Sequence, residues 1–316
     1  MAIQSQEPSS PLYDTITSQQ LALLHDAAHA PLTAHDLRGI ESLNDAVSIS
    51  EVTRVWEPLT ELIRLHIASA ARLTNERAAL LGNKPTRAPF VIGLAGSVAV
   101  GKSTASRLLV ALLSRGVVPL NVALIPTDGF LLPNEKLAQR ELMNRKGFPE
   151  TYDGRALIQF LANLKAGDET LSVPVYSHLE YDIVKDEYVR LVRPDVVVIE
   201  GLNILQTPSA GAELGSVVSD FLDFSIYVDA ETPVIQSWYE ERFLKLRKTA
   251  FANPRSYFHR FASLNDVEAL EKARTIWKTI NEPNLLQNIL GTRERADLII
   301  RKGESHAVEE ISLRRL

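Results

Sequence analysis

The spacing of apolar residues changes near position 90 of the chain. Over residues 18–81 apolar side chains recur every three or four positions, which predicts amphipathic helices. Ser18 is a candidate cap for the first of these helices, and Pro58 is expected to bend or divide a later one. Residues 1–15 are rich in Ser, Pro and Gln and predict a loose arm, and residues 82–89 predict a linker.

After the linker, short runs rich in Val and Ile alternate with helical stretches. The runs are residues 90–95, 121–126, 195–200, 224–228 and 296–300. Nearly continuous apolar runs are typical of strands buried on both faces, which favours a mostly parallel sheet flanked by helices. We therefore expect an α/β fold in which residues 1–89 form an arm and a helical segment. This segment is expected to pack on a core formed by residues 90–316, within one compact domain.

Composition narrows the class of protein. The chain has 316 residues, of which 45% are hydrophobic and 23% charged, which is ample for a sizeable core. A net charge of −5 argues against a basic nucleic-acid-binding surface. The absence of cysteine excludes disulfides, thiolate metal sites and a cysteine nucleophile. With no signal-peptide pattern and no apolar run near ~18 residues, we expect a cytoplasmic protein that does not enter the membrane.

A glycine-rich segment carries the strongest chemical signal. Residues 96–103, GSVAVGKS, fit the pattern G-x-x-x-x-G-K-[ST], with a strand-like run before them and a helical run after them. Glycines let the backbone N–H groups face phosphates, and the following helix adds its positive dipole end. Lys102 is expected to reach the β- and γ-phosphates, and Ser103 to hold Mg²⁺. The flanking strand and helix argue against a chance match in a glycine turn.

Two carboxylates stand at the ends of later predicted strands. Asp128 follows the second run, where it is either a general base, a Mg²⁺ ligand or part of an ordinary Asp-Gly turn. Glu200 ends the third run and is either the carboxylate that completes a Mg²⁺ shell or a cap for the next element.

A predicted helix begins near the segment ETPVIQSWYEERFLKLRK. Thr232 is the expected N-cap and Pro233 the expected first helical residue. Arg242 or Lys245 on this helix is a candidate for neutralising charge on a transferred phosphoryl group. The alternative is a solvated basic face that covers Trp238.

Three short segments combine aromatic and polar residues. PVYSHLEYD contains Tyr176 and His178, NPRSYFHRF contains Tyr257 and Phe258, and WKTIN ends at Asn281. Aromatic side chains with interspersed polar groups are able to wall a small-molecule pocket. At helical spacing they also pack cores, so the residues alone leave both interpretations open.

The remaining motifs separate the functions that begin with such a loop. A regulatory GTPase should carry N-K-x-D downstream, but the one Asn-Lys pair, Asn83-Lys84, precedes the loop. No LSGGQ-like signature of transporter ATPases is present. A small-molecule kinase needs a base, a Mg²⁺-site carboxylate and basic residues on a covering helix, and all have candidates. A nucleotide-binding regulator without a small-molecule acceptor is the alternative.

A set of longer motifs points to one family. The chain carries, in order, GSVAVGKST, TDGF, RKGFPETYD, PVYSHLEYD, EGLNILQ, SDFLDFSIYVDA and NILGTRERADLII. Together they resemble bacterial type I pantothenate kinases, from about LRGIESLND to HAVEEISLRRL. The related uridine kinases and phosphoribulokinases are not expected to combine PVYSHLEYD with SYFHRF. Leu246 and Phe261 depart from the family pattern, in which a bulkier side chain and a tyrosine are expected.

The resemblance implies a P-loop NTPase fold and a specific reaction. The activity implied is ATP- and Mg²⁺-dependent phosphorylation of the terminal hydroxyl of pantothenate, giving 4′-phosphopantothenate in the first step of coenzyme A biosynthesis. The resemblance also implies inhibition by coenzyme A in competition with ATP, and a homodimer. Lys102, Arg107 and His178 are the positions that match the coenzyme A contact.

The resemblance also assigns the site residues. Asp128 is the implied base, Lys102 and Arg242 stabilise the phosphoryl group, and Ser103 and Glu200 serve Mg²⁺. The implied nucleotide-binding residues are Gly96, Ser97, Val98, Ala99, Val100, Gly101, Lys102, Ser103, Thr104 and Arg107, with Asn44, Lys302 and His306 near the adenine. The implied pantothenate-binding residues are Tyr176, His178, Tyr239, Arg242 and Asn281, with an apolar wall of Phe243, Phe251, Tyr257 and Phe258.

Overall fold

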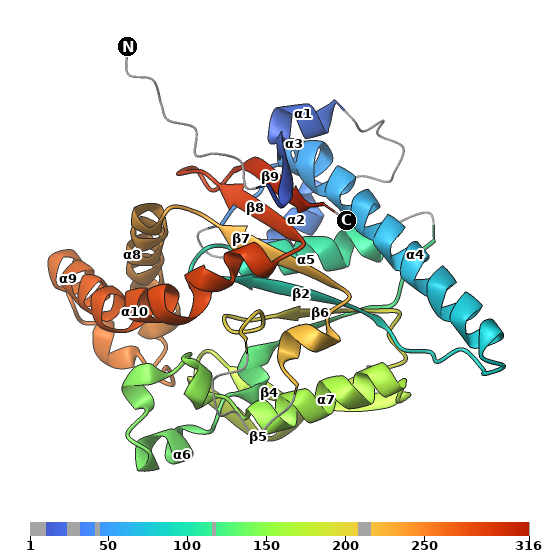
Figure 1. The fold of residues 1–316 in the computed structure, drawn as a ribbon. Coiled ribbons are helices and arrows are strands. Elements are labelled where there is room, and N and C mark those ends of the chain that lie inside the picture. Colours follow the sequence, from blue (N-terminus) through green and yellow to red (C-terminus); the bar gives the residue numbers. More distant parts are fainter. Residues whose placement is uncertain (1–10, 24–31, 42–44, 116–117, 208–215, 316) are drawn as a thin grey trace.

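The computed structural model describes residues 11–23, 32–41, 45–115, 118–207 and 216–315. Its strands are β1 (Tyr13–Thr17), β2 (Phe90–Gly96), β3 (Val122–Pro126), β4 (Thr170–Ser177), β5 (Asp182–Val192), β6 (Val196–Glu200), β7 (Phe224–Asp229), β8 (Leu298–Lys302) and β9 (Val308–Arg314). Within the described residues, seven strands form one sheet in the order β1-β9-β8-β7-β2-β6-β3. Strands β4 and β5 form a separate hairpin below it (Figure 1).

The centre of the sheet is parallel. Strand β2 pairs with β6 and β7, and β3 and β8 extend the parallel part on either side. Strands β9 and β1 add an antiparallel edge. The five apolar runs of the sequence are the five parallel strands, with bounds shifted by at most two residues. The expected α/β fold with a mostly parallel sheet is confirmed.

Four strands were not predicted from the apolar pattern. Strands β1 and β9 lie at the edge of the sheet, and most residues of β5 are partly or fully exposed. Antiparallel strands with one wet face alternate polar and apolar residues, which is a weaker signal than a continuous apolar run.

The alternation of side chains along β6 explains why both faces of the sheet are covered. Val196 and Val198 belong to the core on the side of helix α5 (Lys102–Leu113). Val197 and Ile199 belong to the core on the side of helix α7 (Gly154–Ala166). Because successive strand residues point to opposite faces, an apolar run is buried from both sides only between two helical layers.

The remaining helices surround these layers. They are α1 (Ser18–Ala22), α2 (Ala34–Ile40), α3 (Ile49–Glu51), α4 (Glu57–Leu80), α6 (Asn134–Gln139), α8 (Thr232–Lys248), α9 (Asp266–Ile276) and α10 (Glu282–Asn284). The N-terminal segment therefore supplies helices, as predicted, together with one strand of the central sheet. Helix α4 lies against α5, whereas α8, α9 and α10 gather at the opposite end of the strands (Figure 1).

Two predicted helix starts are corrected by one residue. Thr17, not Ser18, is the N-cap of α1, since its side chain accepts from the Gln20 N–H in a capping box. Glu231, not Thr232, is the N-cap of α8, because the extended backbone ends at Glu231 and Thr232 is already helical. Pro58 stands in the first turn of α4, directly after a π-helical segment at Val52–Trp56, so the helical pattern is divided there.

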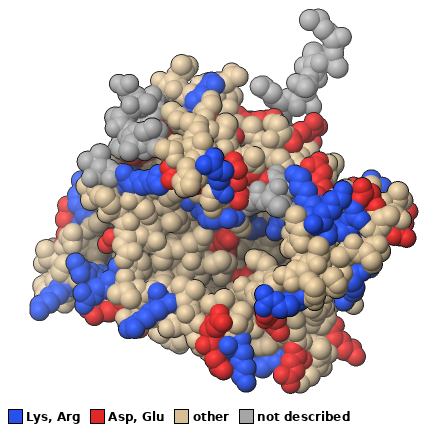
Figure 2. Space-filling view, turned by 180° about the vertical axis from the view of Figure 1, so that it is seen from behind, with Lys and Arg blue, Asp and Glu red and all other residues tan. Residues whose placement is uncertain are grey.

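Charged side chains of both signs are spread over the surface. In the view from behind, Lys and Arg lie among Asp and Glu, and the surface is hollowed near its centre (Figure 2). Among the described residues, none of the helices has the length and apolar character that a membrane crossing requires.

Candidate active site

Three strand ends meet around Glu200, the last residue of β6. The strand register pairs Glu200 with Leu94 of β2 and with Pro126 of β3. Gly96, which opens the glycine-rich loop, and Asp128 each stand two residues beyond these partners. Parallel strands end at the same edge, so the sheet brings the loop, Asp128 and Glu200 to one crevice. This is the position at which open α/β sheets bind ligands.

The glycine-rich loop has backbone angles that favour glycine. Gly96 has φ 145° and Gly101 has φ 97°, and Ala99 between them also has a positive φ of 65°. A Cβ on Gly96 would lie 2.5 Å from the Val228 carbonyl oxygen, so this position is closed to larger residues for two reasons. Helix α5 begins at Lys102, directly after the loop. A tight turn that leads into a helix N-terminus is the geometry of a phosphate cradle.

Lys102 lies across the loop that precedes it. Its Nζ donates to the Ser97 carbonyl oxygen at 2.7 Å. The pKa of Lys102 is lowered to about 8, mainly by burial. The negative charges of Glu200 and Asp128 oppose this shift, and the positive charge of Arg242 adds to it. These electrostatic effects require the four charged groups to be close together. Residues from four distant parts of the sequence therefore act on one another at this crevice.

Both oxygens of the Glu200 carboxylate accept hydrogen bonds from helix α5. Ser103 Oγ donates to Oε1 at 3.1 Å, and Ser106 Oγ donates to Oε2 at 2.7 Å. Among the described residues, no group of three or more His, Cys, Asp or Glu side chains is arranged to hold a metal ion by itself. Mg²⁺ in kinases takes several ligands from water and substrate phosphates, so one hydroxyl and one carboxylate fit it. Ser103 and Glu200 are such a pair.

Asp128 lies in a 3₁₀ turn, Thr127–Phe130, directly after β3. An isolated antiparallel bridge between Leu131 and Tyr152 brings a distant segment beside this turn. Tyr152 Oη is buried and lies beside Thr127 and Asp128. Burial raises the pKa of Tyr152, and the Asp128 charge raises it further. The Asp128 carboxylate therefore has a buried phenol as its neighbour, which the sequence did not indicate.

A cavity of about 950 Å³ opens next to the glycine-rich loop. Its lining includes Val98 of the loop and Asp128, so it adjoins the phosphate cradle. Leu246 and Phe261, the two departures from the family pattern, line it as well. The residues that the resemblance assigns to the acceptor all line this cavity: Tyr176, His178, Tyr239, Arg242, Phe243, Phe251, Tyr257, Phe258 and Asn281.

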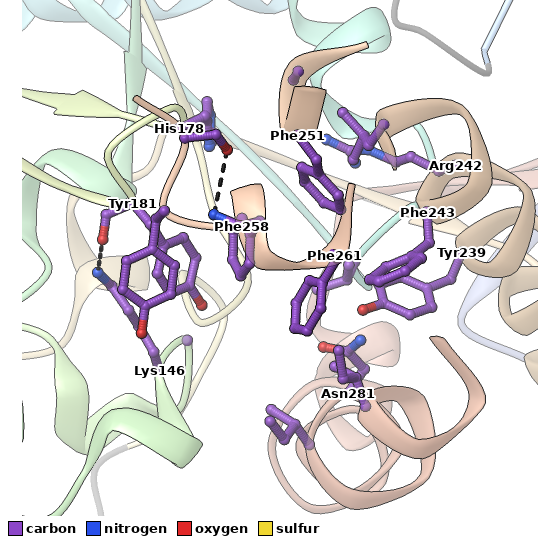
Figure 3. A pocket seen from close by; sticks show the side chains of 18 of the residues that line it. Lys146, His178, Tyr181, Tyr239, Arg242, Phe243, Phe251, Phe258, Phe261 and Asn281 are labelled. Carbon is purple, nitrogen blue, oxygen red and sulfur yellow. Dashed lines mark hydrogen bonds between the residues drawn. The ribbon is translucent and has the colours of Figure 1, made fainter. Parts of the chain in front are cut away.

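One wall of the cavity comes from α8 and the helical turn Trp277–Asn281. The Tyr239 and Asn281 side chains lie next to each other on this wall (Figure 3). Burial raises the pKa of Tyr239 to about 12, and contact with Asn281 opposes the shift. Phe243 packs edge-on against Phe251, with ring centroids 5.4 Å apart. This wall therefore combines an apolar base with a few hydrogen-bonding groups, as small-molecule pockets do.

The opposite wall is the β4–β5 hairpin. The Tyr176 and His178 rings meet edge-on at 5.2 Å, and His178 is exposed. The Tyr257 N–H donates to the Leu179 carbonyl oxygen at 2.9 Å, which ties the hairpin to the aromatic segment after α8. The two walls are thus joined at one side of the cavity (Figure 3).

Not all of the candidate basic residues on α5 and α8 line the cavity. Of the two candidates on α8, Arg242 lines the cavity, and Lys245 is not among its lining residues. Trp238 is buried beneath this helix, and its Nε1 donates to the Glu304 carbonyl oxygen at 3.0 Å. Arg107 lies one turn into α5, and its Nε donates to the Ser103 carbonyl oxygen at 2.7 Å.

The proposed adenine-side residues lie behind the loop. Lys302 is buried, and its Nζ lies 2.6 Å from Asp45 Oδ1. The His306 ring stacks on Trp238 with centroids 4.1 Å apart, and burial lowers the pKa of His306. Asn44 lies outside the described residues.

Sequence reasoning gave no role to Lys146, which lines the cavity between Tyr176 and Tyr181. The Arg145-Lys146 pair stands in the motif RKGFPETYD without any periodic signal. The structure separates the two: Arg145 forms an ion pair with Glu150 at the surface, and Lys146 is buried. Only tertiary packing distinguishes these adjacent cations.

Comparison with known proteins identifies the family of the chain. A profile described as "Phosphoribulokinase / Uridine kinase family" matches residues 91–248. A "Pantothenate kinase" of Sorangium cellulosum is 50% identical over 304 residues, covering 96% of this chain and 98% of the relative. One from Shouchella clausii is 51% identical over 300 residues, covering 95% of each chain.

The fold is also found among solved structures. The D-glycerate 3-kinase of Cryptococcus neoformans matches with a TM-score of 0.56 and 20% identity, covering 79% of this chain and 97% of that one. At this identity the likeness concerns the fold alone, which is that of a P-loop kinase. The sequence relatives carry the closer relationship, since they are about half identical over nearly the full length. The chain is therefore an ATP-dependent kinase that belongs to the phosphoribulokinase and uridine kinase family, in the group of the pantothenate kinases.

Proposed function

We propose that this protein transfers the γ-phosphoryl group of ATP to the terminal hydroxyl of pantothenate, giving 4′-phosphopantothenate and ADP. One observation carries the proposal. The base candidate Asp128 and every residue assigned to the acceptor line a single cavity that adjoins the phosphate-binding loop. Asp128 comes from the turn after β3, and the acceptor residues come from β4, α8 and the segments after them, so their convergence is a property of the fold.

The proposed reaction needs one base and an in-line approach. The acceptor oxygen forms a bond to the γ-phosphorus while the bond from that phosphorus to the β–γ bridging oxygen breaks. The hydroxyl proton passes to Asp128, and the bridging oxygen leaves with ADP. Asp128 suits this role because it stands at the strand-end crevice and lines the acceptor cavity.

Residues on both sides of the reacting group stabilise the negative charge of the transferred phosphoryl group. Lys102 reaches the β- and γ-phosphates from the loop, and Arg242 faces the acceptor side from α8. Ser103 and Glu200 would hold Mg²⁺, which supplies positive charge beside the phosphates when bound. The desolvated ammonium of Lys102 interacts strongly with phosphate, because little water competes for it.

Recognition of the acceptor rests on both walls of the cavity. Tyr239 and Asn281 present a hydroxyl and an amide from one wall, and Tyr176 and His178 present polar groups from the hairpin. Pantothenate has an amide, two hydroxyls and a carboxylate along a short chain, so it requires several such partners. The phenylalanines cover its apolar dimethyl group by van der Waals contact.

We further propose that coenzyme A competes with ATP at this site and that the protein is a cytoplasmic homodimer in the pathway to coenzyme A. Lys102, Arg107 and His178 are the proposed contacts for the inhibitor. Lys302 and His306 are proposed to lie near the adenine, as the family resemblance implies. These statements extend the family resemblance and are tested by inhibition kinetics and by light scattering.

An acceptor panel tests the main proposal. ATP turnover is measured with pantothenate, with uridine and with ribulose 5-phosphate in parallel, with and without coenzyme A. We expect turnover with pantothenate alone, and a rise in the apparent KM for ATP when coenzyme A is present. Turnover with either rival and none with pantothenate would contradict the assignment. Slow ATP hydrolysis unaffected by any acceptor would indicate a nucleotide-binding regulator instead.

A further inference from the structure

Lys146 is a buried cation on the cavity wall. Only 7% of the Lys146 surface is exposed. Nζ donates to Asn134 Oδ1 at 2.6 Å and to the Tyr181 carbonyl oxygen at 2.5 Å. It also lies 4.2 Å from the centroid of the Tyr181 ring and 5.1 Å from that of Tyr176. Lys146 and Tyr181 lie side by side in Figure 3. In the described part of the chain, no carboxylate forms an ion pair with it.

This arrangement leaves the charge of Lys146 without direct compensation. An ammonium has three N–H donors, and the two hydrogen bonds above use two of them, both with neutral acceptors. Burial lowers the pKa of Lys146 to about 8, although the charges of Asp182 and Asp128 act against the shift. A buried cation without an ion-pair partner destabilises the unliganded protein. An anionic ligand in the cavity would relieve this cost.

A purely structural role does not require the charge. The Tyr181 backbone has a strained positive φ of 57°, and its carbonyl oxygen accepts from both Lys146 Nζ and Asn134 Nδ2. The Asn134 N–H in turn donates to Asp182 Oδ1 at 2.9 Å. The neutral Asn134 side chain therefore already holds the hairpin turn. The ammonium adds a positive charge that faces the cavity.

The position of Lys146 suggests which anion it meets. Lys146 and the base candidate Asp128 line the same cavity, and the Asp128 charge acts on the Lys146 ammonium, so both face the reacting end of the acceptor. During transfer Asp128 takes up the hydroxyl proton and loses its negative charge, while the acceptor oxygen gains a phosphate. A negative charge thus disappears from Asp128 and appears on the product beside the same cation. Lys102 stands at the donor end of this path, in the loop.

We propose that Lys146 is the anion-binding residue of the acceptor cavity, and that its ammonium pairs with the phosphate carried by the product. This inference rests on the proposed function, since it takes 4′-phosphopantothenate as the product. Lys146 would be the third cation of the site, beside Lys102 and Arg242. It follows the 3₁₀ turn Met143–Arg145, a segment that supplies no other proposed site residue. The phosphoryl group then passes from cations on the donor side to a cation on the acceptor side.

Calorimetric binding to purified variants tests this assignment. The ligands are 4′-phosphopantothenate, pantothenate and pantothenol, the alcohol analogue that lacks the carboxylate. We expect Lys146→Met to weaken binding of the phosphorylated product about tenfold or more and that of pantothenate less than about threefold. Lys146→Arg should keep product affinity within about threefold. Lys136→Met, which changes an exposed lysine on α6, is the matched control.

A pH series on the wild type gives a readout that does not depend on folding of a variant. Product affinity should fall as pH rises through about 8, because the Lys146 ammonium is then lost. Asp128 and Asp182 face this group, and so do Tyr176 and Tyr181, whose pKa values burial raises. In Lys146→Arg this pH dependence should become weaker, because the guanidinium stays charged. The part that remains belongs to Lys102, whose pKa is also lowered to about 8. A pH dependence as steep in Lys146→Arg as in the wild type would assign it to Lys102 alone.

Three outcomes would overturn the inference. The first is equal loss of affinity for product and pantothenate in Lys146→Met. The second is a loss of affinity in Lys146→Met for pantothenate but not for pantothenol, which would mean that Lys146 binds the acceptor carboxylate. The third is unchanged product binding in a folded Lys146→Met. The proposed function fails separately, when the wild type gives no turnover with pantothenate in the acceptor panel.

Discussion

The Lys302 ammonium lies 2.6 Å from Asp45 Oδ1, and the pair abuts the α-carbon of Gly101. Both side chains are only 5% exposed. Lys302 ends β8, Asp45 belongs to the N-terminal segment, and Gly101 closes the glycine-rich loop. A buried ion pair between two distant segments thus supports the back of the phosphate cradle. The shape of the loop depends on residues that the loop motif does not contain.

Substituting Gly101 by alanine should damage both the loop and this pair. The backbone there has φ 97°, and a Cβ would lie 2.3 Å from Asp45 Oδ2 and 2.7 Å from Lys302 Nζ. We expect a loss of about 1–3 kcal/mol in the free energy of unfolding and weaker ATP binding. Gly291→Ala is the matched control, since a Cβ there meets nothing within 4 Å and φ is not positive. A Gly101→Ala protein as stable as this control would refute the argument.

Removing Asp45 should leave a buried, unpaired cation. Asp45→Ala is expected to destabilise the protein by about 3–5 kcal/mol, because Lys302 keeps its charge without a partner. The double variant with Lys302→Met should recover much of this loss, since no buried charge remains. Urea denaturation of the wild type, the two single variants and the double variant gives the four free energies of unfolding of a double-mutant cycle. Strict additivity of the two losses would mean that the side chains do not interact.

Glu200 should be needed for Mg²⁺-dependent nucleotide binding. Glu200→Gln keeps the size and the possibility of hydrogen bonding to Ser103 and Ser106, but removes the charge that attracts the metal. We expect turnover to fall by about 10²–10³-fold and the Mg²⁺ concentration for half-maximal ATP binding to rise. Ser106→Ala, which frees one carboxylate oxygen, should shift the Mg²⁺ midpoint less. An unchanged Mg²⁺ midpoint in Glu200→Gln would place the metal elsewhere.

Asp128→Asn should separate binding from chemistry. The amide cannot accept the hydroxyl proton, so turnover should fall by about 10²–10⁴-fold while ATP affinity stays within about threefold. Asp195→Asn is a matched control at the opposite end of β6, where Asp195 Oδ2 accepts from the Asn121 N–H at 2.8 Å. Single-turnover kinetics with saturating ATP provide the measurement. Near-normal turnover in Asp128→Asn would remove this residue from the role of base.

The buried charge of Lys102 should lower the free energy of unfolding of the unliganded protein, by an amount that depends on pH. Burial lowers its pKa from 10.5 to about 8, so the folded state disfavours the charge. Below pH 8 both folded and unfolded states hold the proton, and the destabilisation is fully present. Between pH 8 and 10.5 the unfolded state holds more protons, so stability rises with pH and the penalty disappears. Lys102→Met should therefore be more stable than wild type at pH 7, on the order of 1–3 kcal/mol, and equal to it near pH 10.5.

Urea denaturation of both proteins at several pH values measures this difference. A stability gain that is the same at pH 7 and at pH 10.5 would show that it comes from packing of methionine and not from the charge. The measurement is made without nucleotide, since bound phosphate would compensate the ammonium.

The sequence by itself determined the parallel core and the donor half of the site. Continuous apolar runs such as residues 196–199 are stable only between two helical layers, so their pattern is sufficient to predict β6 and its neighbours. The loop from Gly96 to Ser103 is local, and its glycines, lysine and helix start are adjacent in the chain. The edge strands were not predicted, because one wet face leaves a weaker pattern.

Only the tertiary structure decided which of the other polar residues share a cavity. Asp128 and Glu200 come together because the strand register aligns Pro126 with Glu200, and no local pattern encodes that register. Arg145 and Lys146 are adjacent and chemically similar, yet one pairs with Glu150 at the surface and the other is buried. Burial depends on contacts with distant segments, so the sequence alone did not distinguish them.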